Sequence, residues 1–243
     1  MRIEAIALTL RPRLSLEAAD LGLALARAEA RSVWRAFGPL FGLVVLLAVA
    51  TFDIAPWLPM LLIWWLKPWL DCSLLFILSR AVFGQSTSPA DLWRERSAIW
   101  GGQWLRVLFR QRLAPWRSFT QPICQLEGLR GKALRERRRL LLKGRGGAAM
   151  MMQFAFSYIE TALYLGLLLT ILLFTPENQQ AGLFSWFFGE EESGWVDLLQ
   201  TFLYAAVVLA LEPFFVAAGL TMYLNRRVEL EAWDIEQEFR HVF

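Results

Sequence analysis

Four stretches of this chain combine length with an almost complete lack of charge, and they limit what it can fold into. They cover residues 36–52, 54–79, 148–174 and 198–225. Each is about 17–28 residues long, against the roughly 20 that a helix needs to cross the 30 Å hydrocarbon core of a bilayer. The composition agrees, because 56% of the residues are hydrophobic. We therefore predict an all-α integral membrane protein with four transmembrane helices arranged as two hairpins.

Lysine and arginine gather on one side of these stretches. Segments 1–35, 84–147 and 226–243 hold nearly all of these basic residues, whereas 51–58 and 175–196 hold none. The positive-inside rule then predicts a multi-pass protein of the bacterial inner membrane with both termini in the cytoplasm. The predicted divisions are 1–35, a cytoplasmic amphipathic helix; 36–83, transmembrane hairpin 1; 84–147, a cytoplasmic basic amphipathic region; 148–225, transmembrane hairpin 2 with an acidic outer loop at 175–196; and 226–243, a cytoplasmic C-terminal helix.

The predicted cytoplasmic face carries two groups of charged residues. The formal net charge of the chain is only +3, and basic segments beside a membrane commonly meet anionic lipid headgroups. We therefore expect contact with such headgroups and none with nucleic acid. A docking surface for a partner protein is the alternative. The residues of this predicted interface are Arg135, Arg137, Arg138, Arg139, Arg226, Arg227, Glu231 and Asp234.

Four ionisable residues interrupt the predicted spans: Lys67, Asp71, Glu160 and Glu212. A charge at the bilayer centre costs about 2.5–3.5 kcal/mol on insertion scales, so it needs a partner, a proton or a purpose. We expect Lys67 to lie near one of the three carboxylates inside the bundle. Asp71, one helical turn beyond it, suits an ion pair with Lys67.

Two of these charges directly precede a proline, as Lys67-Pro68 and Glu212-Pro213. A proline inside a helix frees a backbone carbonyl, and freed carbonyls beside carboxylates can form a cation or proton site. Ion pairs that only fix which helices pack together are the other interpretation. Both alternatives stay open here.

The two halves of the chain resemble each other weakly. Each has a basic amphipathic helix, an outgoing span, and a returning span that ends in arginine. The returning spans align Leu66-Lys67-Pro68-Trp69 with Leu211-Glu212-Pro213-Phe214. We predict a parallel internal repeat about an axis along the membrane normal, with Lys67 and Glu212 at equivalent depths.

Several short motifs resemble an uncharacterised proteobacterial inner-membrane family. They include Trp64-Trp-Leu-Lys-Pro68, Trp116-Arg-Ser-Phe119, Gln125-Leu-Glu-Gly-Leu-Arg-Gly131 and Glu212-Pro-Phe-Phe215. Genes of that family lie near those for MoxR-type AAA+ ATPases, von Willebrand-type proteins and transglutaminase-associated membrane proteins. The resemblance implies a subunit of an envelope assembly, with an AAA+ ATPase system as a partner. The C-terminal stretch is also distantly similar to the membrane domain of some glycerophosphodiester phosphodiesterases.

No catalytic triad, metal-ligand cluster or nucleotide-binding loop occurs in the sequence, so we expect no enzyme activity, no metal and no cofactor. The leading prediction is a non-enzymatic inner-membrane subunit or scaffold of a bacterial envelope complex. The alternative is an oligomeric small transporter, or an ion-, proton- or lipid-handling module, that uses the mid-membrane charges. Both predictions allow a homo-oligomer.

Overall fold

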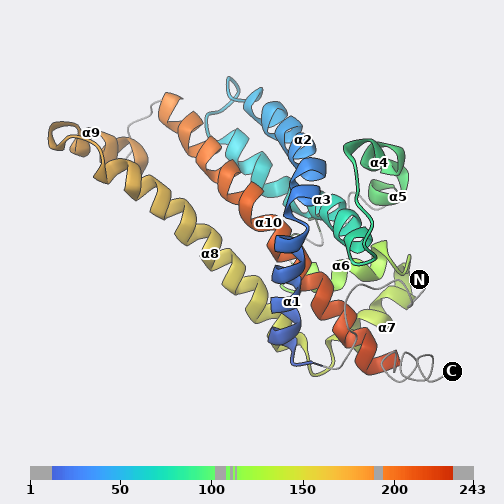
Figure 1. The fold of residues 1–243 in the computed structure, drawn as a ribbon. Coiled ribbons are helices and arrows are strands. Elements are labelled where there is room, and N and C mark those ends of the chain that lie inside the picture. Colours follow the sequence, from blue (N-terminus) through green and yellow to red (C-terminus); the bar gives the residue numbers. More distant parts are fainter. Residues whose placement is uncertain (1–12, 102–107, 110–111, 113, 189–193, 232–243) are drawn as a thin grey trace.

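The structure is a computed structural model, and it describes residues 13–101, 108–109, 112, 114–188 and 194–231. Within these residues the chain forms ten α-helices and no strand (Figure 1). The helices are α1 (Ser15–Ala28), α2 (Ala30–Val49), α3 (Leu58–Ala81), α4 (Pro89–Arg94), α5 (Arg96–Trp100), α6 (Arg117–Gln125), α7 (Gly131–Leu142), α8 (Gly146–Leu173), α9 (Glu177–Phe188) and α10 (Gly194–Glu231).

Four of these helices are long and apolar enough to cross a membrane: α2, α3, α8 and α10. The prediction of an all-α protein with four candidate spans is therefore confirmed, and the helix bounds differ from the predicted ones by a few residues. Helix α10 continues from the last span into the predicted C-terminal helix and is described as far as Glu231. Helix α9 occupies much of the predicted outer loop, 175–196.

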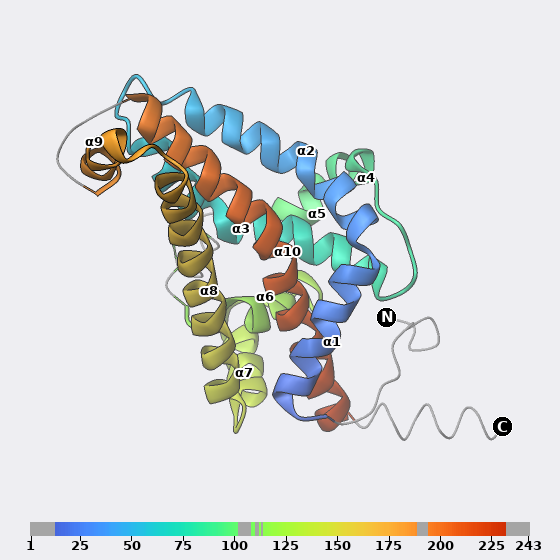
Figure 2. The same cartoon turned by 60° about the vertical axis from the view of Figure 1, so that its left-hand side comes forward.

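Helix α10 lies at the centre of the bundle (Figures 1 and 2). Helices α1, α3, α6 and α8 all pack against it, and α2 packs mainly against α3. The predicted amphipathic helix of 1–35 corresponds to α1, whose small buried side chains lie along the second half of α10. The largest buried side chains, such as Phe37, Leu74 and Tyr223, come from α2, α3 and α10 and fill the core between them.

Two glycines allow helices to approach α10 closely. A Cβ on Gly22 of α1 would overlap the backbone of Ala217 on α10. A Cβ on Gly219 of α10 would overlap Ser118, the second residue of α6. Because small residues let backbones come together, Gly219 fixes where the first turn of α6 can lie.

Helices α5 and α6 lie beside α3, although the whole of 84–147 is predicted to be cytoplasmic. Trp100 stacks on Trp69 at 4.6 Å between ring centroids. Its indole Nε1 also donates to Ser73 Oγ at 3.2 Å. Further along, residues 117–123 of α6 are all buried. The amphipathic pattern of this region therefore reflects packing against membrane-type helices as well as exposure to water.

The predicted internal repeat stays a prediction. Lys67 and Glu212 do come together across α3 and α10. The packing of the two amphipathic helices differs, however, because α1 lies along α10 whereas α7 contacts α6 and the end of α10.

Candidate functional site

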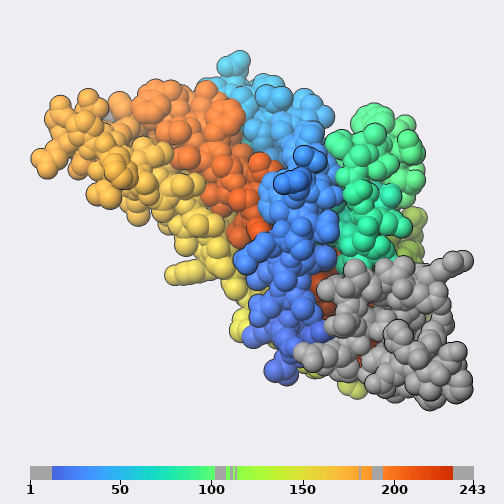
Figure 3. Space-filling view, in the orientation of Figure 1, coloured from blue at the N-terminus to red at the C-terminus, as the bar shows by residue number. Residues whose placement is uncertain are grey.

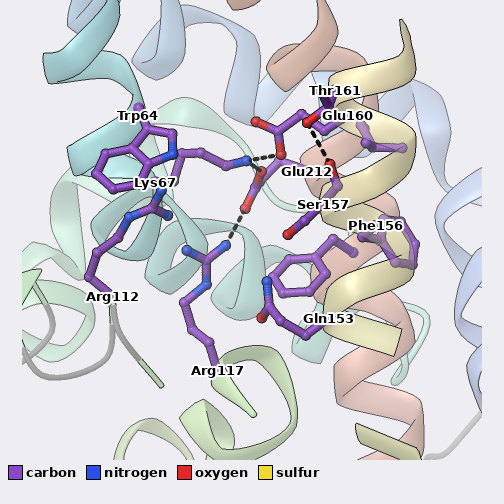
Figure 4. A pocket seen from close by; sticks show the side chains of 12 residues that line it. Trp64, Lys67, Arg112, Arg117, Gln153, Phe156, Ser157, Glu160, Thr161 and Glu212 are labelled. Carbon is purple, nitrogen blue, oxygen red and sulfur yellow. Dashed lines mark hydrogen bonds and ion pairs between the residues drawn. The ribbon is translucent and has the colours of Figure 1, made fainter. Parts of the chain in front are cut away.

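Lys67, near the middle of α3, lies at the centre of a group of charged side chains from three of the long helices (Figure 4). Its Nζ donates to Oε2 of Glu160 on α8 at 2.5 Å and lies 2.8 Å from Oε2 of Glu212 on α10. Lys67 and Glu212 are both buried. The expectation that Lys67 meets carboxylates inside the bundle is confirmed, and the contacts connect α3, α8 and α10.

Arg117 is the partner that the sequence did not reveal. It is the first residue of α6, and its Nη2 donates to Oε1 of Glu212 at 2.8 Å. Its Nε lies 2.9 Å from Oδ2 of Asp71. The only signal for it in the sequence is its place in the motif Trp116-Arg-Ser-Phe119, since the surrounding segment predicts a cytoplasmic region. A planar guanidinium can contact two carboxylates at once, which makes arginine suited to this position.

The predicted ion pair between Lys67 and Asp71 is wrong. Asp71 is fully buried and pairs with Arg117. The order of charges along the helix explains the difference, because lysine N-terminal to a carboxylate is the weaker arrangement for an i,i+4 pair. Lys67 instead contacts the two glutamates on neighbouring helices.

At Pro213 the structure differs from the ion-site interpretation. Pro213 leaves the carbonyl of Leu209 without its helical donor, and the indole Nε1 of Trp34 donates to that carbonyl at 3.2 Å. A side chain of the protein therefore occupies a backbone oxygen that a bound cation would need. On α3, the carbonyl that Pro68 frees is that of Trp64, whereas the carbonyl of Pro68 itself accepts from Gln121 Nε2 at 3.5 Å.

Beside the ion pairs lies a polar cavity of about 110 Å³ between α8 and the rest of the bundle (Figure 4). Arg112 lines it, and its guanidinium carbon lies 3.5 Å from the centroid of the Trp64 ring. The Tyr204 hydroxyl donates to Oε1 of Glu160 at 2.8 Å. The other lining residues are Lys67, Arg117, Gln153, Phe156, Ser157, Thr161, Leu211, Glu212 and Phe215.

The charges around this cavity balance. Three cationic side chains, Lys67, Arg112 and Arg117, face three carboxylates, from Asp71, Glu160 and Glu212. The described part of the chain holds no group of His, Cys, Asp and Glu placed to bind a metal ion. Pairing of opposite charges is what a buried structural network requires, although both oxygens of Asp71 and the Nε of Arg117 lack a hydrogen-bond partner.

A second network joins the middle of α7 to the last turns of α10. Arg137 contacts Glu127 at 2.9 Å and also contacts Glu231. Arg227 lies 2.6 Å from Glu231, and the Tyr223 hydroxyl donates to Glu127 at 2.5 Å. Hydrogen bonding to Glu127 raises the pKa of Arg137 above its ordinary value. The structure thus places three residues of the predicted interface, Arg137, Arg227 and Glu231, in contacts within the protein.

The remaining residues of the predicted interface lie in different surroundings. Arg226 lies 2.7 Å from Glu229, and Arg138 lies over the Trp116 ring. Arg135 and Arg139 are exposed on α7. Asp234 lies outside the described residues. Exposed basic side chains therefore remain on α7 for contact with lipid or with a partner.

Comparisons with known proteins add no information about this site. No protein-family model, curated protein or solved structure matches the chain. What the resemblance noted above implies about an envelope assembly therefore stays a prediction.

Proposed function

We propose that this protein is a non-enzymatic, multi-pass subunit or scaffold of a complex in the bacterial inner membrane. The observation that carries this proposal is the mid-span network, in which Lys67 and Arg117 pair with carboxylates from α3, α8 and α10. Removing one partner of such a buried pair leaves an uncompensated charge, whereas the complete network fixes which helices pack together. We assign these residues a structural role.

Helix α8 supports a role in assembly. Of the most apolar 18-residue stretch of α8, only 6% is buried within the protein, against 67% of the corresponding stretch of α10. Figure 3 shows α8 and α9 projecting from the rest of the molecule. The exposed side of α8 carries Ala162, Gly166 and Thr170 at intervals of four. Small residues at this spacing favour close contact with another membrane helix, from a partner subunit or a second copy of the chain.

One observation favours a second candidate function. The cavity beside Lys67 and Arg112 is polar and lies at the depth of the mid-helix charges, and such sites in membrane proteins mark pathways for ions, protons or substrates. An oligomeric transporter, or an ion-, proton- or lipid-handling module, is therefore the alternative.

Purification in mild detergent followed by native mass spectrometry tests the leading proposal. We expect the wild-type chain to co-purify in a defined complex and Gly166→Leu to weaken it without unfolding the protein. Gly182→Leu on α9 is the matched control, since a Cβ at either glycine meets no atom within 4 Å. A monomeric wild-type protein would contradict the proposal.

Glu160→Gln and Glu212→Gln separate the two candidate functions. If the carboxylates are structural, the amides weaken folding or complex formation. If they form a transport site, the amide variants fold and assemble normally, and ion or proton flux into liposomes is lost. Flux by the wild-type protein is measured first, because its absence removes the second candidate.

A further inference from the structure

A second cavity, of about 370 Å³, lies away from the mid-span charges. One wall is formed by the junction of α1 and α2 and the first turns of α2, from Ala28 to Arg35. The other is formed by residues 86–89, where the chain leaves α3 and enters α4. Figures 1 and 3 show the green α4–α5 segment beside the blue α1–α2 segment. By the charge distribution, both walls lie at the inner membrane boundary.

The cavity carries more positive than negative charge. Arg31 and Arg35 line it; both are exposed, and neither lies within 4 Å of a carboxylate among the described residues. One carboxylate, from Glu29, also lines it, which leaves a net charge of about +1 at neutral pH. The site is therefore complementary to an anion.

Thr87 provides an independent sign of a missing ligand. Its side chain is buried, 6% exposed, and lines the cavity. Its Oγ1 has no hydrogen-bond partner in the structure. A buried hydroxyl without a partner is unfavourable, and buried polar groups in native proteins are normally satisfied. An acceptor oxygen in the cavity would satisfy it.

The surface of α2 continues from this cavity as an apolar stripe. Pro39, Leu43 and Leu46 lie four, eight and eleven residues beyond Arg35, so they share its side of the helix. All three are exposed. Eleven residues of helix span about 16 Å, roughly the thickness of one leaflet of the hydrocarbon core. A basic, hydroxyl-lined cavity therefore adjoins an exposed apolar surface as long as an acyl chain.

We propose that this cavity binds the phosphate headgroup of an anionic phospholipid from the inner leaflet. Arg31 and Arg35 supply the positive charge, Thr87 supplies a hydroxyl donor, and one acyl chain lies along Pro39, Leu43 and Leu46. A basic cavity between membrane helices on the cytoplasmic side is a favourable place for such a headgroup. The proposal goes beyond the proposed function, because it requires neither a partner subunit nor the mid-span network.

Native mass spectrometry of the full chain, delipidated in mild detergent, tests the proposal. The probes are phosphatidylglycerol and phosphatidylcholine with identical acyl chains. We expect one phosphatidylglycerol to bind in preference to phosphatidylcholine. Arg31→Ala combined with Arg35→Ala should lower its binding about tenfold or more, and Thr87→Val about threefold. Glu29→Gln should raise it about threefold.

Two controls make the result specific. Arg130→Ala combined with Lys132→Ala removes the same charge from exposed positions at the start of α7 that lie outside the predicted interface and should leave binding unchanged. Arg31→Lys combined with Arg35→Lys keeps the charge and should retain most of it. Should the alanine pair at 31 and 35 fail to fold in a thermal melt, the lysine pair and Thr87→Val still decide the question.

Inorganic phosphate distinguishes a lipid site from a site for the free ion. We expect millimolar phosphate to leave the bound phosphatidylglycerol in place, because the acyl chain contributes to the lipid's affinity. Displacement of the lipid by phosphate alone would overturn the lipid assignment. Equal binding of the two lipids, or equal loss in the Arg130 and Lys132 control, would overturn the site itself.

Discussion

Helices α8 and α10 form one predicted hairpin, yet they are held in the protein in different ways. Helix α10 is surrounded by other helices, whereas α8 is exposed over most of its length. Near its middle, Glu160 links α8 to the bundle through contacts with Lys67 and Tyr204. Two aromatic pairs flank it, one turn to either side, formed by Phe156 and Tyr164 with rings of α10.

The difference shows which forces position a helix in a membrane. Lipid chains are as apolar as leucine, so burying an apolar side chain against another helix gains little there. Close packing and polar contacts remain, and α10 uses both. Helix α8 is held near its middle by Glu160 and by the rings of Phe156 and Tyr164. Most of its remaining surface is open to lipid or to a partner.

The largest expected effect is the loss of the charge that joins the two helices. Lys67→Met should lower the free energy of unfolding by about 3–5 kcal/mol, because it leaves two glutamates without their shared cation. Unfolding by SDS titration in detergent micelles measures the change. Lys132→Met is the control, since Lys132 is highly exposed. Equal stability of the two variants would show that the network does not hold the bundle.

A single type of substitution can contrast α10 with α8. Gly219→Leu should cost about 1–3 kcal/mol, because the added side chain would overlap Ser118 and displace α6. Gly166→Leu on α8 should leave the stability of the monomer unchanged, since a Cβ there meets no neighbouring atom. The same SDS titration compares them. A larger loss of stability for Gly166→Leu would mean that another part of the protein packs closely against α8 at Gly166.

Neutralising the carboxylate of α8 should separate that helix while leaving the others together. Glu160→Gln removes the ion pair with Lys67, which keeps Glu212 as a partner, so we expect a loss of about 2 kcal/mol. Spin labels at exposed positions on α8 and α10 should report a wider and longer distance distribution. An unchanged distribution would show that the aromatic pairs are sufficient to hold α8.

The smallest expected effect concerns the hydroxyl that orients Glu160. Tyr204→Phe should cost about 1.5 kcal/mol, since it removes one hydrogen bond to a charged group and keeps the ring that packs on Tyr164. Tyr164→Phe serves as the control, because its own hydrogen bond to Gln200 is long, at 3.4 Å. A greater loss for the Tyr164 variant would place the main polar anchor of α8 elsewhere.

The sequence reveals the four long helices because length and lack of charge are local properties. It also predicts that Lys67 meets carboxylates, since a buried charge needs a partner wherever it lies. It does not reveal which one, because Asp71 is near in sequence while Glu160 and Glu212 are near in space. Arg117 was missed for the same reason. The basic residues around it predict a cytoplasmic segment, whereas in the structure α6 packs against both α3 and α10.

The long sequence separation within the mid-span network has a consequence for biosynthesis. Lys67 and Glu160 are 93 residues apart, and ribosomes add about 5–20 residues per second. Helix α3 is therefore made roughly 5–20 s before Glu160, the first carboxylate on another helix that pairs with Lys67. During that interval Lys67 lacks the carboxylates with which it pairs in the folded protein.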